Sequence, residues 1–247
     1  MGKLANKVAV ITGASKGIGA AVAKALAAEG ASVIVNYASS KAGADSVVES
    51  ILADGGKAIA VAGDVSKAAE AGEIIKAAIT HFGRLDILVN NAGVYEFSPL
   101  AAITEDRYRR MFDINVLGLI LMTQAAAEHL REGSSVINIG SNITSMKPPS
   151  SALYAASKGA VDTITGVLAK ELGPKKIRVN SINPGPTATE GTENFMSSDS
   201  DMGRVMIAQT PLGRLGRPED VASVAVFLAS DDSGWITGDI LQASGGL

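Results

Sequence analysis

A strand that runs directly into a glycine-rich turn restricts the fold of this 247-residue chain more than any other feature. Residues 7–12 (KVAVIT) form a β-branched run, which is typical of a strand buried on both faces. Glycines follow at positions 13, 17 and 19, and the alanine-rich residues 20–29 predict a helix. Such a turn is either a tight connection alone or a place where backbone N–H groups and a helix dipole meet a phosphate. The order strand, turn, helix favours the second. The predicted contacts are Gly13, Ser15, Lys16, Gly17, Ile18 and Gly19.

Apolar runs and helical stretches alternate along the rest of the chain. Strands are predicted at residues 32–36, 57–62, 86–89, 134–140, 177–182 and 237–243. Helices are predicted at residues 42–54, 66–82, 104–128, 152–172 and 218–230. The alternation predicts an α/β fold, a Rossmann-type doubly wound parallel sheet of about seven strands with helices on both faces. No repeat or linker interrupts it, so we expect a single domain over residues 1–247.

Composition disfavours several classes of protein. The net charge of −3 gives no general attraction to nucleic acid or to an anionic membrane. No apolar run is long enough to span a bilayer, and residues 1–15 lack the long apolar stretch of a secretory signal. There is no cysteine, and His81 and His129 have no second ligand nearby, so no metal site is predicted. We expect a soluble cytoplasmic protein without a nucleic-acid or membrane partner.

The carboxyl end of the second predicted strand indicates which dinucleotide the chain prefers. An acidic residue there accepts from a free ribose 2′-OH and repels a 2′-phosphate. This chain instead has Asn36, Tyr37, Ser39 and Ser40, followed by Lys41, and Lys16 adds a second cation. Residues 39–41 could equally do no more than begin the next helix. The neutral donors and the cations favour NADP(H), with NAD(H) as the alternative.

Two later strand ends extend the predicted cofactor site. Asp64 follows the third strand, where its carboxylate could accept from an adenine amino group. It could equally form a turn or cap the next helix, although Ser66 is the more natural cap. Val65 lies beside it. After the fourth strand, small and amide residues would let a cofactor lie close to the backbone; these are Asn91, Ala92 and Gly93.

Residues 141–158 hold three side chains suited to proton transfer. Ser141 follows the fifth predicted strand, at the edge where ligands bind in open α/β sheets. Tyr154 and Lys158 are four residues apart on a predicted helix, so they share one face. An ammonium near a phenol lowers the phenol's pKa, which predicts a proton donor usable near neutral pH. Taken alone, this spacing is more often a packed ring and a solvated charge.

Asn115 lies in the middle of the helix predicted at residues 104–128, in apolar surroundings. A buried amide there must be hydrogen-bonded. It is either a structural link between helix and sheet or a place where the helix bends and holds a water.

Residues 188–211 form a connection longer than ordinary ones, which is either a lid over a site or a mobile insertion. Their apolar side chains favour a partly apolar substrate, and the proline-stiffened residues 146–151 are a further candidate wall. The apolar residues are Phe195, Met196, Met202 and Met206, and the acids Glu190, Glu193, Asp199 and Asp201 are interpreted as solvated charges.

Together these motifs resemble the one-domain short-chain dehydrogenases/reductases over essentially the whole chain. The resemblance rests, in order, on residues 12–19 (TGASKGIG), 64–65 (DV) and 90–93 (NNAG), Asn115, Ser141, the Tyr154-x-x-x-Lys158 pair and residues 184–185 (PG). Within the family the chain looks most similar to 3-oxoacyl-carrier-protein reductases and to glucose-1-dehydrogenase-like and naphthol-reductase-like enzymes.

The resemblance implies an activity and a role for each residue. It implies hydride transfer from NADPH to a ketone or 3-oxoacyl carbonyl, giving a secondary alcohol reversibly. Tyr154 is implied as the proton donor, Lys158 as the group that lowers its pKa and binds the nicotinamide ribose, and Ser141 as the group that polarises the carbonyl. Asn115 is implied to hold a water that connects Lys158 to solvent. The implied cofactor contacts also include Pro184, Gly185, Thr187 and Thr189.

Two other functions stay open: an NAD-dependent sugar or polyol dehydrogenase, and a cofactor-binding regulatory protein. The presence of all four catalytic residues disfavours the regulatory protein. The basic cluster of Lys175, Lys176 and Arg178 is either a patch for an acyl carrier protein or a solvated face. By analogy with the family, we expect a homotetramer.

Overall fold

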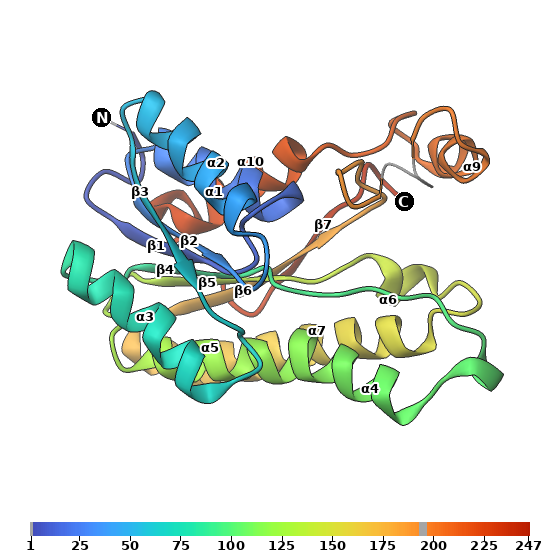
Figure 1. Ribbon diagram of the computed structural model, residues 1–247, viewed down its shortest axis with the longest axis horizontal. Helices are drawn as coiled ribbons and strands as arrows, with labels where there is room; N and C mark the ends of the chain where they lie inside the picture. The colour runs from blue at the N-terminus through green and yellow to red at the C-terminus, as the bar shows by residue number, and fades with distance from the viewer. Residues whose placement is uncertain (1, 193–196) are drawn as a thin grey trace.

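The computed structural model describes residues 2–192 and 197–247 and confirms the predicted α/β fold. Seven parallel strands form one sheet in the order β3-β2-β1-β4-β5-β6-β7 (Figure 1). The strands are β1 (Val8–Ile11), β2 (Ser32–Tyr37), β3 (Lys57–Ala62), β4 (Ile87–Asn90), β5 (Ser135–Ile139), β6 (Arg178–Pro184) and β7 (Ile240–Ala243).

Helices cover both faces of this sheet (Figure 1). One face carries α1 (Gly17–Ala28), α2 (Lys41–Ala53) and α10 (Pro218–Ala229). The other carries α3 (Ala68–Phe82), α4 (Glu105–Phe112), α5 (Gly118–Ala127) and α7 (Ala152–Leu172). Shorter elements are the 3₁₀ turns η1 (Leu100–Ala102), η3 (Gly173–Lys175) and η4 (Asp231–Ser233), the π-helical segment η2 (Asp113–Leu117), and the helices α6 (Ile143–Met146) and α9 (Asp201–Gln209).

Burial on both faces explains why the central strands are apolar throughout. Along β1, Ala9 and Ile11 pack into the cluster under α1, α2 and α10, whereas Val8 and Val10 pack into the cluster under α3, α5 and α7. Every residue of β1, β4, β5 and β6 is buried, while the edge strands β3 and β7 are partly exposed. The pattern that predicted the strands is therefore a consequence of two-sided packing.

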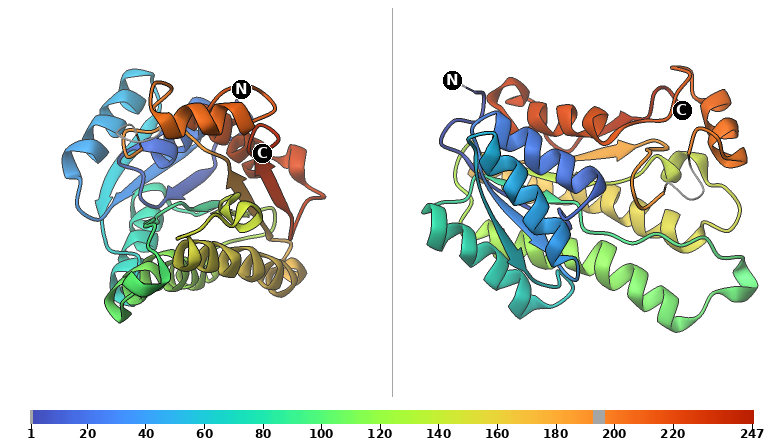
Figure 2. Two further views of the ribbon diagram at one scale, coloured as in Figure 1. Left: turned by 90° about the vertical axis from the view of Figure 1, so that its right-hand side faces the viewer. Right: turned by 45° about the horizontal axis from the view of Figure 1, so that its top comes forward.

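The sheet brings the predicted site residues to one edge. The order of the strands reverses between β1 and β4, so the connections after these two strands lead to opposite faces. The carboxyl ends of β1, β4, β5 and β6 meet at this edge, and α6 and α9 lie beyond it (Figure 2). Ligands bind at such a crevice in open α/β sheets.

Two predicted helices differ from the observed ones. The helix predicted at residues 104–128 is divided into α4, η2 and α5, with the irregular turn at Asn115. The helix predicted to begin at Ser66 begins at Ala68 instead, and Lys67 is its N-cap residue. The N–H and hydroxyl groups of Ser66 instead both donate to Asp64.

The basic cluster at residues 175–178 does not form a patch. The Arg178 guanidinium is buried and donates to Ser233 Oγ and to the carbonyl of Ser230. Lys176 pairs with Glu132 at 2.6 Å. Within the described residues, no helix combines the length and apolar character that crossing a membrane requires.

Asp86 lies at the amino end of the strands, at the opposite edge of the sheet from the crevice. Its contribution to stability can therefore be tested separately. Its buried carboxylate accepts from the N–H of Val8 at 2.9 Å and from two nitrogens of Arg84 at 2.8 and 2.6 Å. We predict that Asp86→Ala lowers the free energy of unfolding by about 2–4 kcal/mol, because it leaves the buried N–H of Val8 without a partner and removes the ion pair with Arg84. The control Asp45→Ala removes an exposed ion pair with Lys41 and should cost less than about 1 kcal/mol. Urea unfolding of both variants measures this, and equal losses would contradict it.

Candidate active site

The turn between β1 and α1 packs closely against the chain that follows β4. Gly13 and Gly17 have φ angles of 59° and 56°, which residues with a Cβ rarely adopt. A Cβ at Gly13 would lie 2.9 Å from the Cα of Ala92, and a Cβ at Gly19 would collide with the amide of Asn91. The side chain of Lys16, the N-cap residue of α1, makes no capping hydrogen bond. The N-terminus of α1 therefore presents backbone N–H groups to the crevice.

Thr12 and Asn91 bind the two sides of this crevice together. The Asn91 amide donates to the carbonyls of Thr12 and Gly13 at 2.8 and 3.0 Å. In return, Thr12 Oγ1 accepts from the N–H groups of Asn91 and Ala92 at 3.0 and 2.9 Å. Asn91 and Gly93 also line the cleft described below. The residues after β4 therefore shape the glycine turn as well as the crevice.

Asn36 does not lie where a cofactor phosphate could reach its side chain, which corrects the prediction. It is only 1% exposed. Its Oδ1 accepts from the N–H of Gly13 at 3.2 Å, and its Nδ2 donates to the carbonyls of Val61 and Gly63. The reason is that Asn36 lies inside β2, where a short amide can hold the glycine turn against β3. Its role in this structure is to position the turn.

The other residues predicted near the adenosine end lie at one edge of the crevice. Tyr37 is half-buried, and Ser39 and Ser40 are exposed. The carbonyl of Ser15 packs against Gly43 of α2, where a Cβ would lie 2.7 Å from it, so the glycine turn and the start of α2 adjoin. The cations differ: Lys41 pairs with Asp45 at 2.6 Å, whereas exposed Lys16 has no ion pair within the part of the chain that the structure describes.

Asp64 forms a turn, one of the three alternatives that its position allowed. Its Oδ1 accepts from Ser66 Oγ at 2.7 Å and from the N–H of Ser66 at 3.0 Å. The bond from the Ser66 hydroxyl contributes most to holding the pKa of the Asp64 carboxyl below its usual value. The bond from the Ser66 N–H and the charge of Lys67 contribute less. Val65 is buried and packs against Gly118, which has no room for a Cβ beside it. The contact of Asp64-Val65 with an adenine stays a prediction.

Ser141, Tyr154 and Lys158 converge as the sequence predicted. Ser141 lies two residues beyond β5, and Tyr154 and Lys158 lie in the first two turns of α7. The Ser141 hydroxyl lies near enough to the Tyr154 phenol to lower its pKa, and both residues line the cleft described below. The Lys158 ammonium donates to the carbonyl of Ile139, the last residue of β5, at 2.7 Å. The Tyr154 ring meets Tyr95 and Phe97 edge to face, with centroids 6.3 and 6.2 Å apart.

The expected lowering of the Tyr154 pKa by Lys158 is wrong for the protein alone. Burial raises the pKa of Tyr154, and the Ser141 hydroxyl lowers it by a smaller amount. Lys158 is itself buried, which lowers its pKa to about 8, although the charge of Asp162 opposes this change. The ammonium is directed to the Ile139 carbonyl rather than to the phenol. Spacing along the helix predicted the shared face but not this direction.

Asn115 holds the chain after β4 against two helices. Its Oδ1 accepts from the N–H of Val94 at 2.8 Å, and its Nδ2 donates to the carbonyl of Val94 at 2.8 Å. Nδ2 also donates to Ser157 Oγ on α7 at 3.0 Å. The residue is 2% exposed and lies in η2, whose hydrogen bonding reaches from the N–H of Gly118 to the carbonyl of Asp113. Asn115 is therefore a structural link, as the first interpretation held. The helix is also irregular there, which is one part of the second interpretation.

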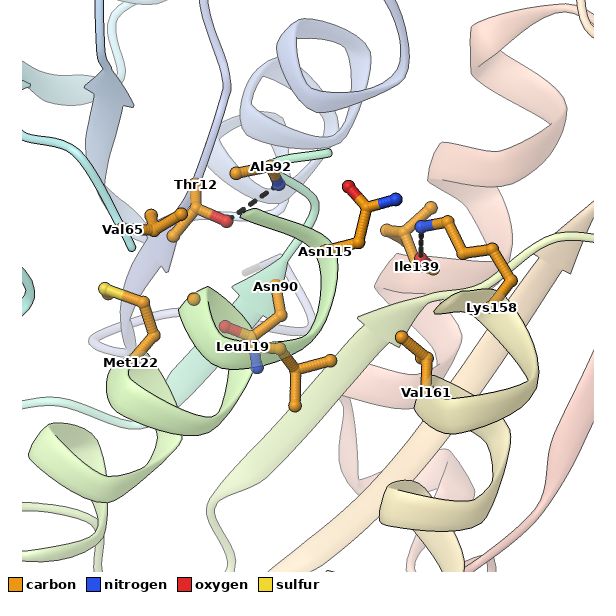
Figure 3. A pocket seen from close by; sticks show the side chains of 11 residues that line it. Thr12, Val65, Asn90, Ala92, Asn115, Leu119, Met122, Ile139, Lys158 and Val161 are labelled. Carbon is orange, nitrogen blue, oxygen red and sulfur yellow. Dashed lines mark hydrogen bonds between the residues drawn. The ribbon is translucent and has the colours of Figure 1, made fainter. Parts of the chain in front are cut away.

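A small buried cavity lies between η2, β4 and Lys158 (Figure 3). Asn90 Nδ2 donates to Thr123 Oγ1 and to Asn138 Oδ1, at 3.0 and 2.9 Å. Because Thr123 Oγ1 donates to the carbonyl of Leu119, it can only accept from Asn90, which fixes the orientation of the Asn90 amide. Among the described residues, Asn90 Oδ1 has no hydrogen-bond partner. Asn90 is one of the residues that line the cavity, whose volume of about 10 Å³ suits one water.

An apolar cleft of about 540 Å³ opens in front of Tyr154 and Ser141. Its walls include the predicted loop at residues 146–151 through Met146, Pro148 and Pro149, and α9 through Met202 and Met206. Predicted lid residues Phe195 and Met196 lie outside the described residues. Further lining residues are Ile18, Tyr95, Phe97, Lys158, Pro184, Gly185, Thr187 and Thr189. The cleft therefore joins the proposed reacting groups to the glycine turn.

Two charged residues near this cleft had not been assigned a role from the sequence. Asp162 lies one turn beyond Lys158, and its carboxylate accepts from Asn183 Nδ2 at 3.1 Å. Burial raises the pKa of its carboxyl. Its spacing of four from Lys158 is the signal that could have found it. Glu190, predicted to be a solvated charge, instead accepts from the N–H of Gly17 at 3.1 Å.

Both histidines are exposed, and in residues 2–192 and 197–247 no group of three histidine, aspartate or glutamate side chains could hold a metal ion.

Comparison with known proteins agrees with this arrangement. The family described as enoyl-(acyl carrier protein) reductase matches residues 13–247. An uncharacterized oxidoreductase of Methylorubrum extorquens is 60% identical over the whole of both chains. A hydroxynaphthalene reductase-like protein of Metarhizium guizhouense is 39% identical, covering 98% of this chain and 95% of its own. The structure of a Burkholderia cenocepacia short chain dehydrogenase in complex with NADP has a TM-score of 0.94, 37% identity and coverage of 99% and 98%.

The fold and the site define an oxidoreductase built on a Rossmann-type sheet. The chain belongs to the short-chain dehydrogenase/reductase family, as the family match and the 60% identical relative show. The resemblance inferred from the sequence motifs is confirmed.

Because Lys158 is buried, the free energy of unfolding should depend on pH in a way that can be tested. Below about pH 8 both the folded and the unfolded chain carry this proton, so the cost of burial is fully present. Between about 8 and the ordinary value of 10.5, the folded protein releases the proton while the unfolded chain keeps it, so stability rises. Relative to Lys158→Met, the wild type should therefore gain up to about 1.4 kcal/mol per pH unit in this window.

Denaturant unfolding between pH 7 and pH 9.5 measures the difference between the two proteins. Lys170→Met, which removes an exposed lysine from the same helix, is the matched control and should run parallel to the wild type. Parallel curves for the wild type and Lys158→Met would contradict the prediction.

Proposed function

We propose that this protein reduces a ketone or 3-oxoacyl carbonyl to a secondary alcohol with NADPH, and that the reaction is reversible. One observation carries the proposal: Ser141 and Tyr154 lie together in the wall of an apolar cleft that also reaches Lys158 and Ile18 of the glycine turn. A carbonyl oxygen placed between the two hydroxyls could accept from both. Reduction places negative charge on that oxygen, which these donors stabilise.

The residues of the crevice fit a nicotinamide dinucleotide. The N-terminus of α1 already binds an anionic oxygen, since Gly17 donates to the Glu190 carboxylate. The close contact of Gly13 with Ala92 leaves backbone rather than side chains facing the crevice. When bound, the nicotinamide supplies the hydride. The proposed cofactor contacts are the glycine-turn residues, Tyr37, Ser39, Ser40, Asp64, Val65, Asn91, Ala92, Gly93, Tyr154, Lys158, Pro184, Gly185, Thr187 and Thr189, without Asn36.

Tyr154 is the proposed proton donor, and its raised pKa makes a second group necessary. A buried phenol with a raised pKa keeps its proton at neutral pH but gives that proton up less readily. The Lys158 ammonium, one helical turn away, would favour the phenolate formed as the proton leaves. Asn115 and Lys158 line the same small cavity, which supports a water near Asn115 as the source of the replacement proton.

The cleft supports a substrate with an apolar, planar part. Tyr95 and Phe97 both meet the Tyr154 ring edge to face, and Met202 and Met206 also line the cleft. The name of the Metarhizium guizhouense relative, hydroxynaphthalene reductase-like, points the same way. A small polyol would leave these apolar walls without contacts.

The proposed cofactor preference rests on exposed Lys16, which follows Ser15 in the turn that adjoins Gly43 at the start of α2. Lys41 is already paired with Asp45, so Lys16 is the better partner for a 2′-phosphate. The Burkholderia cenocepacia structure was determined with NADP, which supports the same choice.

The remaining sequence predictions also stay proposals. We propose one dinucleotide-binding and catalytic domain with a substrate lid near residues 188–211, supported by Met202 and Met206 in the cleft wall. We also propose a homotetramer, because large apolar side chains are exposed on the surface. Those on adjoining helices are Tyr108, Leu117, Ile120 and Val167, and Trp235 is exposed elsewhere. A cytoplasmic location stays a prediction.

Tyr154→Phe tests the proposed proton donor. We predict that kcat for reduction of an activated aromatic ketone falls by at least about 100-fold, because no group replaces the phenol proton. NADPH should still bind, since the ring and the glycine turn are kept, and fluorescence titration measures this. The control Tyr108→Phe removes an exposed hydroxyl on α4 and should leave kcat unchanged. Full activity of Tyr154→Phe would exclude the proposed role.

Lys16→Ala tests the proposed cofactor preference. The KM for NADPH should rise by about tenfold, as expected for loss of one charge-assisted contact, while the KM for NADH changes little. Lys24→Ala, at an exposed position of the same helix, is the control. A wild type that uses NADH more efficiently than NADPH would refute the preference.

A further inference from the structure

The N-terminus of α1 is bonded to a carboxylate from a distant part of the chain. Gly17, the first residue of α1, donates its N–H to Glu190 Oε2 at 3.1 Å. The side chain of Thr189 also lies against Gly17, where a Cβ would be 3.5 Å from it. Lys16 offers no side-chain cap, so this carboxylate takes the place of a capping group.

Glu190 is placed by a hydrogen-bonded turn rather than by a loose loop. The N–H of Thr189 donates to Thr192 Oγ1 at 2.9 Å, and Thr192 Oγ1 contacts the carbonyl of Thr187 at 3.1 Å. The turn begins beside Gly216, whose carbonyl accepts from the N–H of Ala188 at 2.9 Å. These bonds hold the acid in front of the glycine turn.

The same turn reaches the substrate side of the cleft. The Tyr95 hydroxyl donates to the carbonyl of Gly191, next to Glu190, at 2.7 Å. The Tyr95 ring in turn meets the Tyr154 ring edge to face. Residues 187–192 therefore connect the N-terminus of α1 with the wall around Tyr154.

A carboxylate and a phosphate oxygen compete for the same kind of partner. Both are anions that accept from backbone N–H groups at the positive end of a helix dipole, and they repel each other at short distance. We propose that Glu190 is an intramolecular competitor of the cofactor pyrophosphate at the N-terminus of α1. The dinucleotide displaces this carboxylate when it binds, and the displacement reaches Tyr95 through Gly191. This inference rests on the proposed function.

Two consequences distinguish this role from simple capping. A competitor lowers the apparent affinity of the free protein for its cofactor by the fraction of molecules in which the N–H is taken. Removing it therefore strengthens cofactor binding. A cap without competition would instead make Glu190 variants less stable and leave the affinity unchanged.

Isothermal titration calorimetry of NADP⁺ and NADPH into the wild type, Glu190→Gln and Glu190→Ala tests the proposal. We expect Kd for both dinucleotides to fall by about three- to tenfold in both variants, the range for loss of one charged hydrogen bond at a surface. Glu190→Ala should show the larger effect, because a glutamine amide still accepts weakly from Gly17. Glu73→Gln removes an equal charge from an exposed position of α3 and should leave Kd unchanged.

Unchanged or weaker binding by both Glu190 variants, with normal binding by the wild type, would overturn the proposal and leave the proposed function intact. Equal strengthening by Glu73→Gln would also overturn it, because the effect would then be one of net charge. A wild type and variants that all fail to bind either dinucleotide would instead refute the proposed function.

Discussion

The close join between the glycine turn and the chain after β4 is the contact on which the rest of the site depends. Gly13 can lie against Ala92 only because it has no Cβ, and the Asn91 amide then bonds to the carbonyls of Thr12 and Gly13. Two connections that leave the sheet on opposite faces are thereby locked together at its carboxyl edge. A dinucleotide bound at the N-terminus of α1, as proposed, would lie across this join with its far end toward Ser141 and Tyr154.

Buried amides extend that join to the proposed reacting groups. Asn115 clamps Val94 to η2 and α7, and Asn90 ties β4 to α5 and to Asn138 on β5. A buried amide costs stability unless its groups are paired, so these networks act as rigid links. They support Lys158, whose charge is buried and therefore costly to hold. The site thus carries an unfavourable charge that the surrounding fold must offset, as is common where a group is used for proton transfer.

Much of this arrangement could be predicted from the sequence, because it follows from periodicity and position. Strands buried on both faces need apolar residues throughout, so they could be recognised as apolar runs. The ends of those runs showed that Ser141 and Asn91 lie at one edge of the sheet. What could not be predicted depends on the direction of single side chains. Asn36 turns inward to Gly13, Arg178 is buried against η4, and Lys158 donates to Ile139 instead of approaching the phenol. Glu190 meets Gly17 across 173 positions, a contact that no local pattern encodes.

The central claim is that the Ser141 and Tyr154 hydroxyls receive a carbonyl that takes its hydride from NADPH. Its most direct test uses NADPH carrying deuterium at the reactive position of the nicotinamide, incubated with the wild type and an aromatic ketone. The account predicts that mass spectrometry finds one deuterium in the alcohol, bonded to the carbinol carbon. A protein that binds NADPH and the ketone, yet yields no labelled alcohol across a panel of apolar ketones and 3-oxoacyl thioesters, would contradict it.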